Sequence, residues 1–200
     1  MPGPAEIRIL RAAGRAAAPW KNGGGVTREI AAWPEDAGTA GFAWRVSLAE
    51  VETDGPFSSF PGVDRILTLA EGAGMDLTVG GDRHLVDERY APRYFPGDRP
   101  TDCRLLGGPV VNFNVMYHRD RVRARSAVVR GELVLRALPG ETLLVVALDG
   151  PATLHRPELP AVRTELGRHD AALLRESPAC VVRTEGRAAV VGVHAVPGGE

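Results

Sequence analysis

The sequence predicts an all-β protein whose strands form two jelly-roll barrels. Short apolar runs recur along the whole chain of 200 residues, and most of its 24 glycines and 16 prolines fall between them. This rhythm of strand and small-residue turn is typical of barrels and sandwiches. Helical periodicity is scarce, because only Arg11–Ala18 looks locally helical and Pro19 would end that helix.

The expected strands follow one another along the chain with short turns between them. Most are bounded by glycine, proline or another turn residue, and none continues a helical period over a long segment. In chain order they cover residues 7–10, 26–32, 42–51, 63–70, 75–79, 102–106, 110–117, 124–129, 133–138, 142–148, 152–154, 161–165, 171–174, 179–184 and 188–196.

A similar order of strands and turns occurs twice, over residues 63–98 and 142–186. It predicts a first barrel over residues 1–120, which carries the motifs described below, and a second barrel over residues 121–200. No segment has the composition of a linker, so we expect the two barrels to pack as one compact unit. The best candidate for their connection is the segment 119–127.

Composition argues against several classes of protein. With 25 acidic and 24 basic residues, the chain has no global field that would attract nucleic acid or an anionic membrane. The N-terminus lacks the pattern of a signal peptide, and apolar runs such as Leu143–Leu148 are too short to span a bilayer. Cys103 and Cys180 are expected to be buried, reduced thiols. We therefore expect a cytoplasmic protein without nucleic acid or membrane partners; a homodimer is left open.

The segment 19–30 contains the only lysine of the chain. Lys21 lies between a tryptophan and Asn22, which is followed by three glycines. A compact ammonium there would differ from the guanidinium used at every other basic position. A single lysine in a glycine-rich turn is more often simply solvated. A functional role for Lys21 therefore depends on the residues around it. The glycines follow the lysine, the reverse of the order in a phosphate-binding loop, so no nucleotide site is expected.

In the strand 42–51, alternation places Arg45 and Ser47 on one face and Trp44 on the other. If the first face lines a barrel interior, the guanidinium must meet an anion, either a protein carboxylate or a ligand carboxylate. If it faces solvent, the arrangement has no functional meaning.

The loop 53–65 contains two prolines, with Phe57 and Phe60 as apolar anchors, and loops of this kind often close over a barrel mouth. Arg65 begins the next strand, where an ion pair with Asp64, Asp54 or Glu52 is the alternative to a ligand contact.

Two asparagines share one face of the strand 110–117. Asn112, Asn114 and Met116 alternate onto this face, although asparagine is depleted in strands. Carboxamides that both donate and accept hydrogen bonds, projecting into a cavity, would explain them. The alternative is that they satisfy turn backbone at the end of a barrel.

These segments together resemble the signature blocks of the HutD/Ves family. The resemblance covers residues 19 to 119, and the second half matches only in its strand-rich character. The blocks are Pro19-Trp20-Lys21-Asn22-Gly23-Gly24-Gly25 with Thr27, Phe42-Ala43-Trp44-Arg45 with Ser47 and Ala49, Gly55-Pro56-Phe57-Ser58 with Phe60-Pro61-Gly62 and Arg65, and Phe113-Asn114-Val115-Met116.

The resemblance implies a two-barrel fold of the cupin superfamily, a bicupin, in a cytoplasmic bacterial protein. In the HutD branch it implies control of histidine utilisation through binding of a pathway intermediate such as urocanate or N-formylglutamate, whereas the Ves branch is associated with stress responses. The family usually has aspartate where this chain has Asn112. That difference removes a carboxylate from the expected cavity and changes the ligand that it would accept.

No metal and no cofactor are expected. Many cupins hold a metal through two closely spaced histidines, a glutamate and a later histidine, whereas this chain has no His-x-His and its histidines are scattered. The five histidines are His84, His118, His155, His169 and His194.

Two function classes remain, and binding of a small anionic molecule is favoured over catalysis. The alternative is a metal-free isomerase or epimerase acting on a small anionic substrate, which would need an acid–base pair such as His84 with Asp87 or His118 with Asp120. The candidate ligand-binding residues are Lys21, Asn22, Thr27, Trp44, Arg45, Ser47, Phe57, Arg65, Asn112, Asn114 and Met116.

Overall fold

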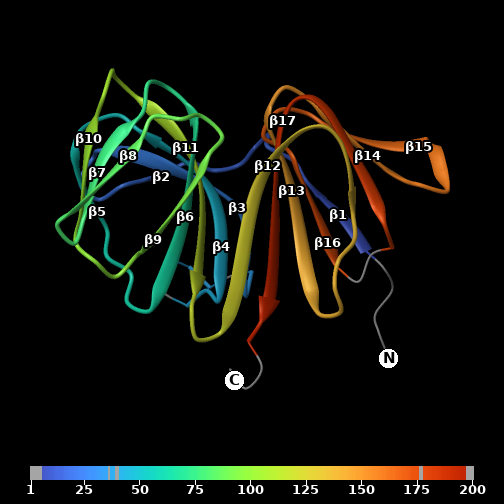
Figure 1. Cartoon of the computed structure of the whole chain (residues 1–200), viewed down its shortest axis with the longest axis horizontal. Helices are drawn as coiled ribbons and strands as arrows, with labels where there is room; N and C mark the ends of the chain where they lie inside the picture. Colours follow the sequence, from blue (N-terminus) through green and yellow to red (C-terminus); the bar gives the residue numbers. More distant parts are fainter. Residues whose placement is uncertain (1–5, 36, 39–40, 176–177, 197–200) are drawn as a thin grey trace. The chain divides into compact units, whose positions relative to one another are not determined.

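The computed structural model describes residues 6–35, 37–38, 41–175 and 178–196. These residues form seventeen strands and no helix, so the all-β prediction is confirmed (Figure 1). Within the same described ranges, no helix has the length and apolarity needed to cross a membrane. The chain divides into two compact units, one of residues 15–123 and one of the described residues among 1–14 and 124–197.

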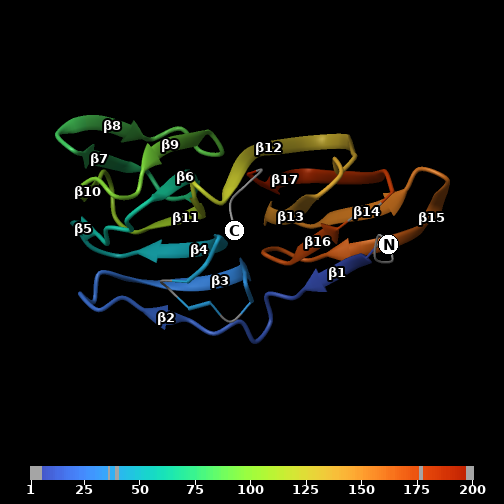
Figure 2. The ribbon, with the colours of Figure 1, turned by 90° about the horizontal axis from the view of Figure 1, so that it is seen from below.

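The middle unit, residues 15–123, contains two sheets, whose strand order can be followed in Figure 2. All pairs in both sheets are antiparallel. The six-stranded sheet has the order β2 (Ala18–Pro19), β3 (Gly25–Trp33), β4 (Trp44–Val51), β11 (Val110–His118), β6 (Val63–Glu71), β9 (Pro92–Pro96). The four-stranded sheet has the order β5 (Gly55–Phe57), β10 (Thr101–Leu105), β7 (Met75–Val79), β8 (Asp82–Val86).

An apolar core joins these two sheets. Leu67 and Leu69 of β6 pack with Met75 and Leu77 of β7, and each is at most 1% exposed. Because alternate residues of a strand face opposite sides of a sheet, Arg65 projects from the same face of β6 as the two leucines. Arg65 therefore continues the row of β6 side chains that contributes to this core.

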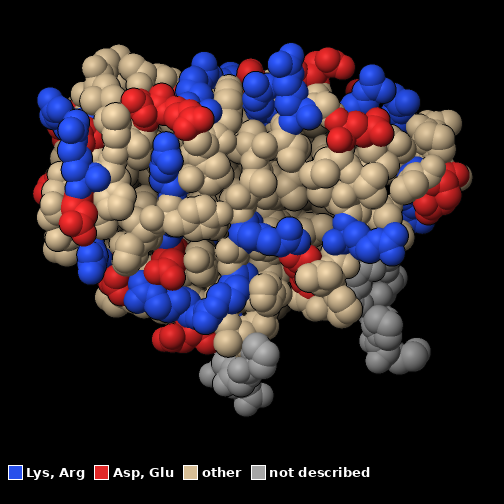
Figure 3. Space-filling view, in the orientation of Figure 1, with Lys and Arg blue, Asp and Glu red and all other residues tan. Residues whose placement is uncertain are grey.

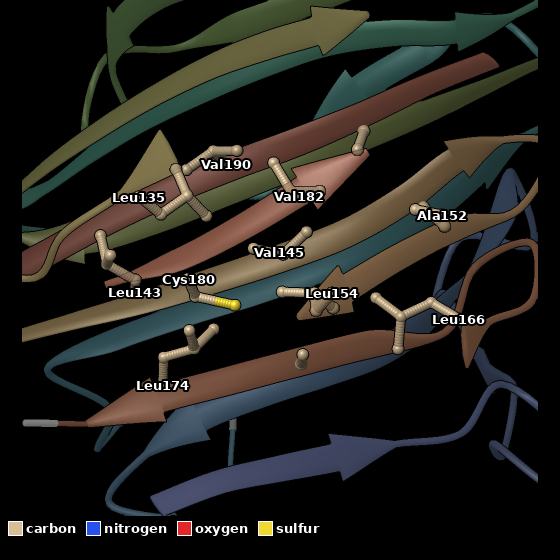
Figure 4. Close-up of a cluster of buried hydrophobic side chains, with 13 residues drawn as sticks. Leu135, Leu143, Val145, Ala152, Leu154, Leu166, Leu174, Cys180, Val182 and Val190 are labelled. Atoms are coloured by element: carbon tan, nitrogen blue, oxygen red, sulfur yellow. The ribbon is translucent and has the colours of Figure 1, made fainter. Parts of the chain in front are cut away.

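The other unit is built on one seven-stranded sheet with its own core (Figure 4). Val145, Leu154 and Leu174, each at most 1% exposed, belong to this core. The sheet has the order β1 (Glu6–Leu10), β16 (Ala171–Arg175), β13 (Glu141–Asp149), β17 (Cys180–Ala195), β14 (Ala152–Arg156), β15 (Leu159–Leu166), and β12 (Val122–Leu135) also pairs with β17.

The domain boundaries differ from the sequence prediction at the N-terminus. The observed division at residue 123 is close to the predicted one at 120. However, β1 pairs with β16, so the described residues before Arg15 belong with the C-terminal half rather than with the first barrel. Sequence pattern identifies a strand but not a partner so distant in the chain.

The short helix expected over Arg11–Ala18 is wrong. Instead, these residues form a bend and a turn followed by extended chain. The Asp170 carboxylate accepts hydrogen bonds from the Ala12 amide and the Arg11 guanidinium, both at 2.7 Å. Gly14 then adopts a φ of 79°, which a right-handed helix does not allow. Contacts with a distant residue thus decide the local conformation.

Three short strands were not expected from the pattern, namely β2, β5 and β9, whereas β8 is the strand expected after the Gly80-Gly81 turn. Two pairs of expected strands are also continuous: residues 124–138 belong largely to β12, and residues 179–196 belong largely to β17. The cysteine prediction is confirmed, because Cys103 and Cys180 are both buried and neither forms a disulfide.

Candidate functional site

A cavity of about 570 Å³ lies inside the middle unit. It is lined from five parts of the chain: the segment containing β2 and the following turn, then β3, β4, the loop from β5 to β6 with the start of β6, and β11. The lining residues are Ala18, Pro19, Trp20, Lys21, Asn22, Thr27, Arg45, Ser47, Ala49, Pro56, Phe57, Ser58, Ser59, Phe60, Arg65, Asn114 and Met116.

Strand alternation and register bring the polar lining residues together. On β11, Asn114 pairs with Ser47 of β4, and Met116 pairs with Arg45. On its other side, Met116 pairs with Arg65 of β6. Because these residues alternate on their strands, they project from one face of the six-stranded sheet. Two guanidinium groups therefore flank a methionine in one row, and an asparagine with a serine occupies the next.

Arg65 is buried and has no acceptor for its Nε atom among the described residues. Its side chain lies among three aromatic rings: its guanidinium carbon is 5.1 Å from the ring centre of Phe57, 5.9 Å from that of Phe60 and 5.5 Å from that of Phe95. Ring faces attract a cation but cannot accept as an oxygen does. Burial, and secondarily the charge of Arg45, lowers the pKa of Arg65 to about 10. The group remains a cation at neutral pH, and an anionic ligand would relieve this destabilisation.

Arg45 is also buried, but it has a protein partner. Its Nε donates a hydrogen bond of 2.6 Å to Oε2 of Glu29, whose side chain is 40% exposed. Glu29 is the protein carboxylate that a buried guanidinium requires. A ligand carboxylate can bind Arg45 as well, since this contact uses only one of its five N–H groups. Glu29 is not among the site residues predicted from the sequence. The signal was available, because Glu29 follows Thr27 by two residues and alternation places both on the same face.

Asn114 contributes a buried acceptor. The residue is 5% exposed, and its Oδ1 atom has no hydrogen-bond partner among the described residues. Unsatisfied buried oxygens of this kind are uncommon in proteins. An atom that lines a cavity in this state is available to a ligand.

The segment before β3 forms one wall of the cavity. Trp20 packs edge-on against Phe57, with ring centres 5.9 Å apart. Its indole Nε1 donates a hydrogen bond of 2.8 Å to Oγ1 of Thr27. The Trp20 amide also donates to the Gly25 carbonyl, which closes the turn. Trp20 thus orients the Thr27 hydroxyl and holds the segment before β3 in place.

Two glycines of the triglycine run meet different steric demands. Gly23 has a φ of 71°, a conformation that most other residues rarely adopt. At Gly25, an added Cβ would lie 2.2 Å from the Glu50 carbonyl oxygen, which leaves no room for a side chain. Asn22 supports the turn, because its Oδ1 accepts a hydrogen bond from the Gly24 amide. Lys21 is exposed at the edge of the cavity.

The loop between β5 and β6 forms the opposite wall and is tied down at its end. The Phe60 amide donates to the Gly97 carbonyl at 2.8 Å, and the Arg119 amide donates to the Gly62 carbonyl at 3.0 Å. The Arg119 side chain forms ion pairs with Asp64 and Asp98. The pKa of Asp98 is consequently lowered, mainly by its hydrogen bond from Arg119. Asp64 thus pairs with Arg119 and not with Arg65, whose side chain lines the cavity.

Nine of the eleven predicted site residues line the cavity: Lys21, Asn22, Thr27, Arg45, Ser47, Phe57, Arg65, Asn114 and Met116. Trp44 does not, because alternation on β4 turns its side chain to the other face of the sheet. Asn112 does not line it either. Although it shares a face with Asn114, Asn112 lies deeper, is 1% exposed, and donates from Nδ2 to the Met75 sulfur at 3.4 Å.

The remaining lining residues were missed as site residues, and most of them come from loops and turns. Alternation identifies the inward face of a strand, but it cannot say which loop side chains fold over it. Ala49 alone could have been found by alternation from Arg45 and Ser47. The other missed residues are Ala18, Pro19, Trp20, Pro56, Ser58, Ser59 and Phe60.

Groups suited to proton transfer are scarce at this cavity. Among the described residues that line it, none is His, Asp, Glu, Cys or Tyr. The two histidines considered for an acid–base pair lie elsewhere: His84 is on β8, and His118 packs near the Phe42 ring. Within the described ranges, no group of three or more His, Cys, Asp or Glu side chains could hold a metal ion.

Comparison with known proteins identifies relatives over most of the chain. The family model HutD matches residues 12–191. An uncharacterised 21.2 kDa protein from the hutC 3′ region of Pseudomonas putida is 38% identical over 142 residues, which cover 71% of this chain and 74% of that protein. Protein Ves from Cronobacter sakazakii is 38% identical over 110 residues, covering 54% of this chain and 59% of Ves.

Solved structures agree with these matches. HutD from Pseudomonas fluorescens SBW25 is 33% identical with a TM-score of 0.82, covering 96% of this chain and all of that one. A conserved protein of unknown function from Pseudomonas aeruginosa PAO1 is 33% identical with a TM-score of 0.83, covering 94% and 99%. The pirin YhhW from Escherichia coli has a TM-score of 0.69 at 9% identity, covering 94% and 98%, and indicates a cupin-like fold alone. By sequence and structure, the chain belongs to the HutD family.

Proposed function

We propose that this protein binds a small carboxylate without the help of a metal, and that binding regulates histidine utilisation. The observation that carries the proposal is the Arg65 guanidinium, which is buried at the cavity and has no acceptor for its Nε among the described residues. A buried charge without a partner destabilises a fold, unless a ligand supplies the missing anion. A carboxylate suits this position because its two oxygens match the planar fork of a guanidinium.

The neighbouring groups favour an anion as well. Lys21 and Arg45 also line the cavity. The carboxylate that pairs with Arg45, from Glu29, offsets one of these three positive charges. The cavity therefore carries an excess of positive charge in a chain whose formal net charge is −1. Elsewhere, on the surface visible in Figure 3, basic and acidic side chains are interspersed.

The identity of the relatives bears on the biological role. The Pseudomonas putida relative is named for the hutC 3′ region, and a solved relative is named HutD. We therefore propose urocanate or N-formylglutamate, the intermediates implied by the family resemblance, as the first ligands to test. Catalysis on such an anion is the weaker proposal, because no His, Asp or Glu is among the described lining residues.

We further propose that the two compact units are the two barrels of a bicupin in a cytoplasmic protein. Each unit has its own buried apolar cluster, which supports this division. The proposed absence of a metal is tested by elemental analysis of the purified protein, where about one tightly held ion per chain would contradict it.

The binding proposal is tested by calorimetry and thermal unfolding with urocanate, N-formylglutamate and, as a neutral control, urocanate methyl ester. A ligand that binds the folded state raises the melting temperature in a concentration-dependent way. We expect a rise with at least one of the two acids and none with the ester. Arg45→Lys should weaken binding although the charge is kept, because the planar fork is lost.

A matched control is Arg28→Lys. Arg28 forms a similar cross-strand ion pair, with Glu50 at 2.8 Å, but it does not line the cavity. This variant should bind like the unaltered protein. If neither acid binds at millimolar concentration, the proposed function is wrong; if both lysine variants bind normally, Arg45 does not contact the ligand.

A further inference from the structure

The polar groups that line the cavity are mostly hydrogen-bond donors. Lys21, Arg45 and Arg65 carry only N–H groups. The Thr27 oxygen already accepts from the Trp20 indole, so its hydroxyl hydrogen remains to be donated. The Asn22 oxygen is occupied by a backbone amide. A carboxylate, which only accepts, complements every one of these groups.

Asn114 is different, because its Oδ1 is an acceptor that lacks a donor. The residue is 95% buried, and among the described residues nothing donates to this oxygen. A carboxylate oxygen cannot satisfy another acceptor and would repel it. An anionic ligand that fills the cavity and displaces water from it therefore leaves this atom unsatisfied unless the ligand brings a donor of its own.

We propose that the ligand carries a hydrogen-bond donor, an N–H or O–H group, in addition to its anionic group, and that Asn114 Oδ1 accepts this hydrogen bond. The inference rests on the proposed function and narrows it, from small carboxylates in general to those that bear a polar hydrogen. N-acyl amino acids and heteroaromatic acids with a ring N–H belong to this class, whereas simple alkyl carboxylates do not.

Strand geometry separates the two subsites. Asn114 lies two residues from Met116 on β11, and Met116 lies between the two arginines in the register. Two residues along a strand correspond to roughly 7 Å between backbone positions. The anion and the donor therefore belong to different parts of the ligand, and a single small ion such as formate can occupy only one subsite.

Selectivity is the expected consequence. A site built to hydrogen-bond a polar hydrogen rejects analogues that lack it, because the acceptor is then left buried and unpaired. Loss of one such hydrogen bond corresponds to a weakening of roughly 10- to 100-fold in the dissociation constant. Analogues of the same charge and nearly the same size should therefore differ by this factor.

Two matched pairs of probes test the inference by calorimetry at pH 8. The first pair is urocanate and 3-(thiazol-4-yl)acrylate, in which sulfur replaces the ring N–H. The second pair is N-acetylglutamate and 2-acetoxyglutarate, in which an ester oxygen replaces the amide N–H. In each pair that binds, the member with the N–H should bind roughly 10- to 100-fold more tightly.

The variant Asn114→Leu removes the acceptor at similar side-chain size and should bring the affinity ratio within a pair close to one. The control is Asn112→Leu, two residues away on the same strand but outside the cavity lining, which should keep the ratio. Equal affinities within a pair in the unaltered protein would overturn the inference while leaving carboxylate binding intact. A ratio that survives Asn114→Leu would assign the selectivity to another residue and overturn it too. If no probe binds, the proposed function itself fails.

Discussion

Arg45 and Arg65 flank Met116 from neighbouring strands and line the same cavity, but their electrostatic environments differ. Arg45 is paired with Glu29 through its Nε. Arg65 Nε has no acceptor among the described residues, and Arg65 is held among three aromatic rings. The charge of Arg45 itself disfavours the protonated form of Arg65. This asymmetry makes the second arginine the more informative target for mutation.

Replacing Arg65 with methionine should stabilise the protein without ligand and abolish anion binding. The variant removes a buried, unpaired charge but keeps an apolar stem among the rings. We expect the free energy of unfolding to increase by about 1–3 kcal/mol, since replacing buried charges with apolar groups can stabilise by this amount. Urea unfolding and calorimetry measure the two effects.

The control for Arg65→Met is Arg93→Met. Arg93 lies on the neighbouring strand β9 and is partly exposed, and among the described residues its ion pair is a long surface contact of 3.5 Å with Glu88. Its replacement should change stability by less than about 0.5 kcal/mol and leave binding unaltered. A clear loss of stability in Arg65→Met would instead mean that this arginine is a structural element with an unrecognised partner.

Replacing Glu29 with glutamine should tighten anion binding. The carboxamide oxygen can still accept the hydrogen bond from Arg45, whereas the negative charge that competes with the ligand is gone. Because the Glu29 side chain is 40% exposed, the gain is modest, about 0.5–1 kcal/mol or roughly 2- to 5-fold in affinity. The gain should shrink at high salt, which screens partly exposed charges.

Glu50→Gln is the matched control for this effect. Glu50 pairs with Arg28 across the same two strands, β3 and β4, but neither residue lines the cavity. Affinity should not change in this variant. Equal tightening in both variants would point to a general electrostatic effect and not to competition at Arg45.

Anion binding should fall in alkaline solution as Arg65 loses its proton. Its folded pKa of about 10 lies below the ordinary pKa of an arginine side chain, so below pH 10 the charged group opposes folding, and this penalty declines as pH rises through the folded pKa. A bound anion favours the charged form. Affinity attributable to Arg65 should therefore be constant from pH 7 to 9 and decrease up to roughly tenfold per pH unit above about 10.

Calorimetry over this pH range measures the profile, with Lys21→Gln as a variant that keeps both arginines. The decline should persist in Lys21→Gln and be absent from any residual binding in Arg65→Gln. A decline that disappears in Lys21→Gln would assign the titration to the lysine.

The sequence predicts the strands of the six-stranded sheet well, because one face of each is buried and the pattern is strong. The residues that β4 and β11 contribute to the cavity follow from alternation alone, as Arg45, Ser47, Asn114 and Met116 illustrate. Alternation also predicts that Trp44 faces away. Trp44 belongs to the family motif, but the strand pattern gives its side chain no place in the cavity.

Other features depend on contacts that no local pattern encodes. The N-terminal strand β1 pairs with β16, more than 160 residues away in the chain. The sequence pattern of Arg11–Ala18 predicts a helix, but hydrogen bonds to Asp170 hold the start of this segment in another conformation. Phe95 joins the rings around Arg65 because β9 pairs with β6, and that strand was not predicted. The sequence also does not show how deeply a side chain lies in the fold. Asn112 and Asn114 share a face, but only Asn114 reaches the cavity.

The position of Asn112 changes what its replacement by aspartate should do. The sequence pattern predicts this residue in the cavity, where a carboxylate would weaken anion binding. In the structure its amide contacts the Met75 sulfur, which cannot donate a hydrogen bond to a carboxylate. Asn112→Asp should therefore destabilise the fold, by about 3 kcal/mol or more at pH 8, while ligand affinity stays within about twofold of the unaltered protein.

The pH dependence of this destabilisation has a definite sign. Burial should raise the pKa of a carboxyl group at position 112 above its unfolded value of about 3.9. The loss of stability should then be smallest near pH 4 and grow by up to about 1.4 kcal/mol per pH unit until the folded pKa is reached. Urea unfolding at pH 4.5, 6 and 8 measures this trend.

Asn114→Asp, two residues along the same strand, is the contrasting variant. Its carboxylate would lie in the row next to Arg45 and Arg65, which can pair with it. This variant should retain stability at pH 8 and lose anion binding, because it places a competing charge in the cavity. If Asn112→Asp instead weakens binding and leaves stability unchanged, position 112 reaches the ligand, and the boundary between the apolar core and the cavity lies deeper than the lining residues indicate.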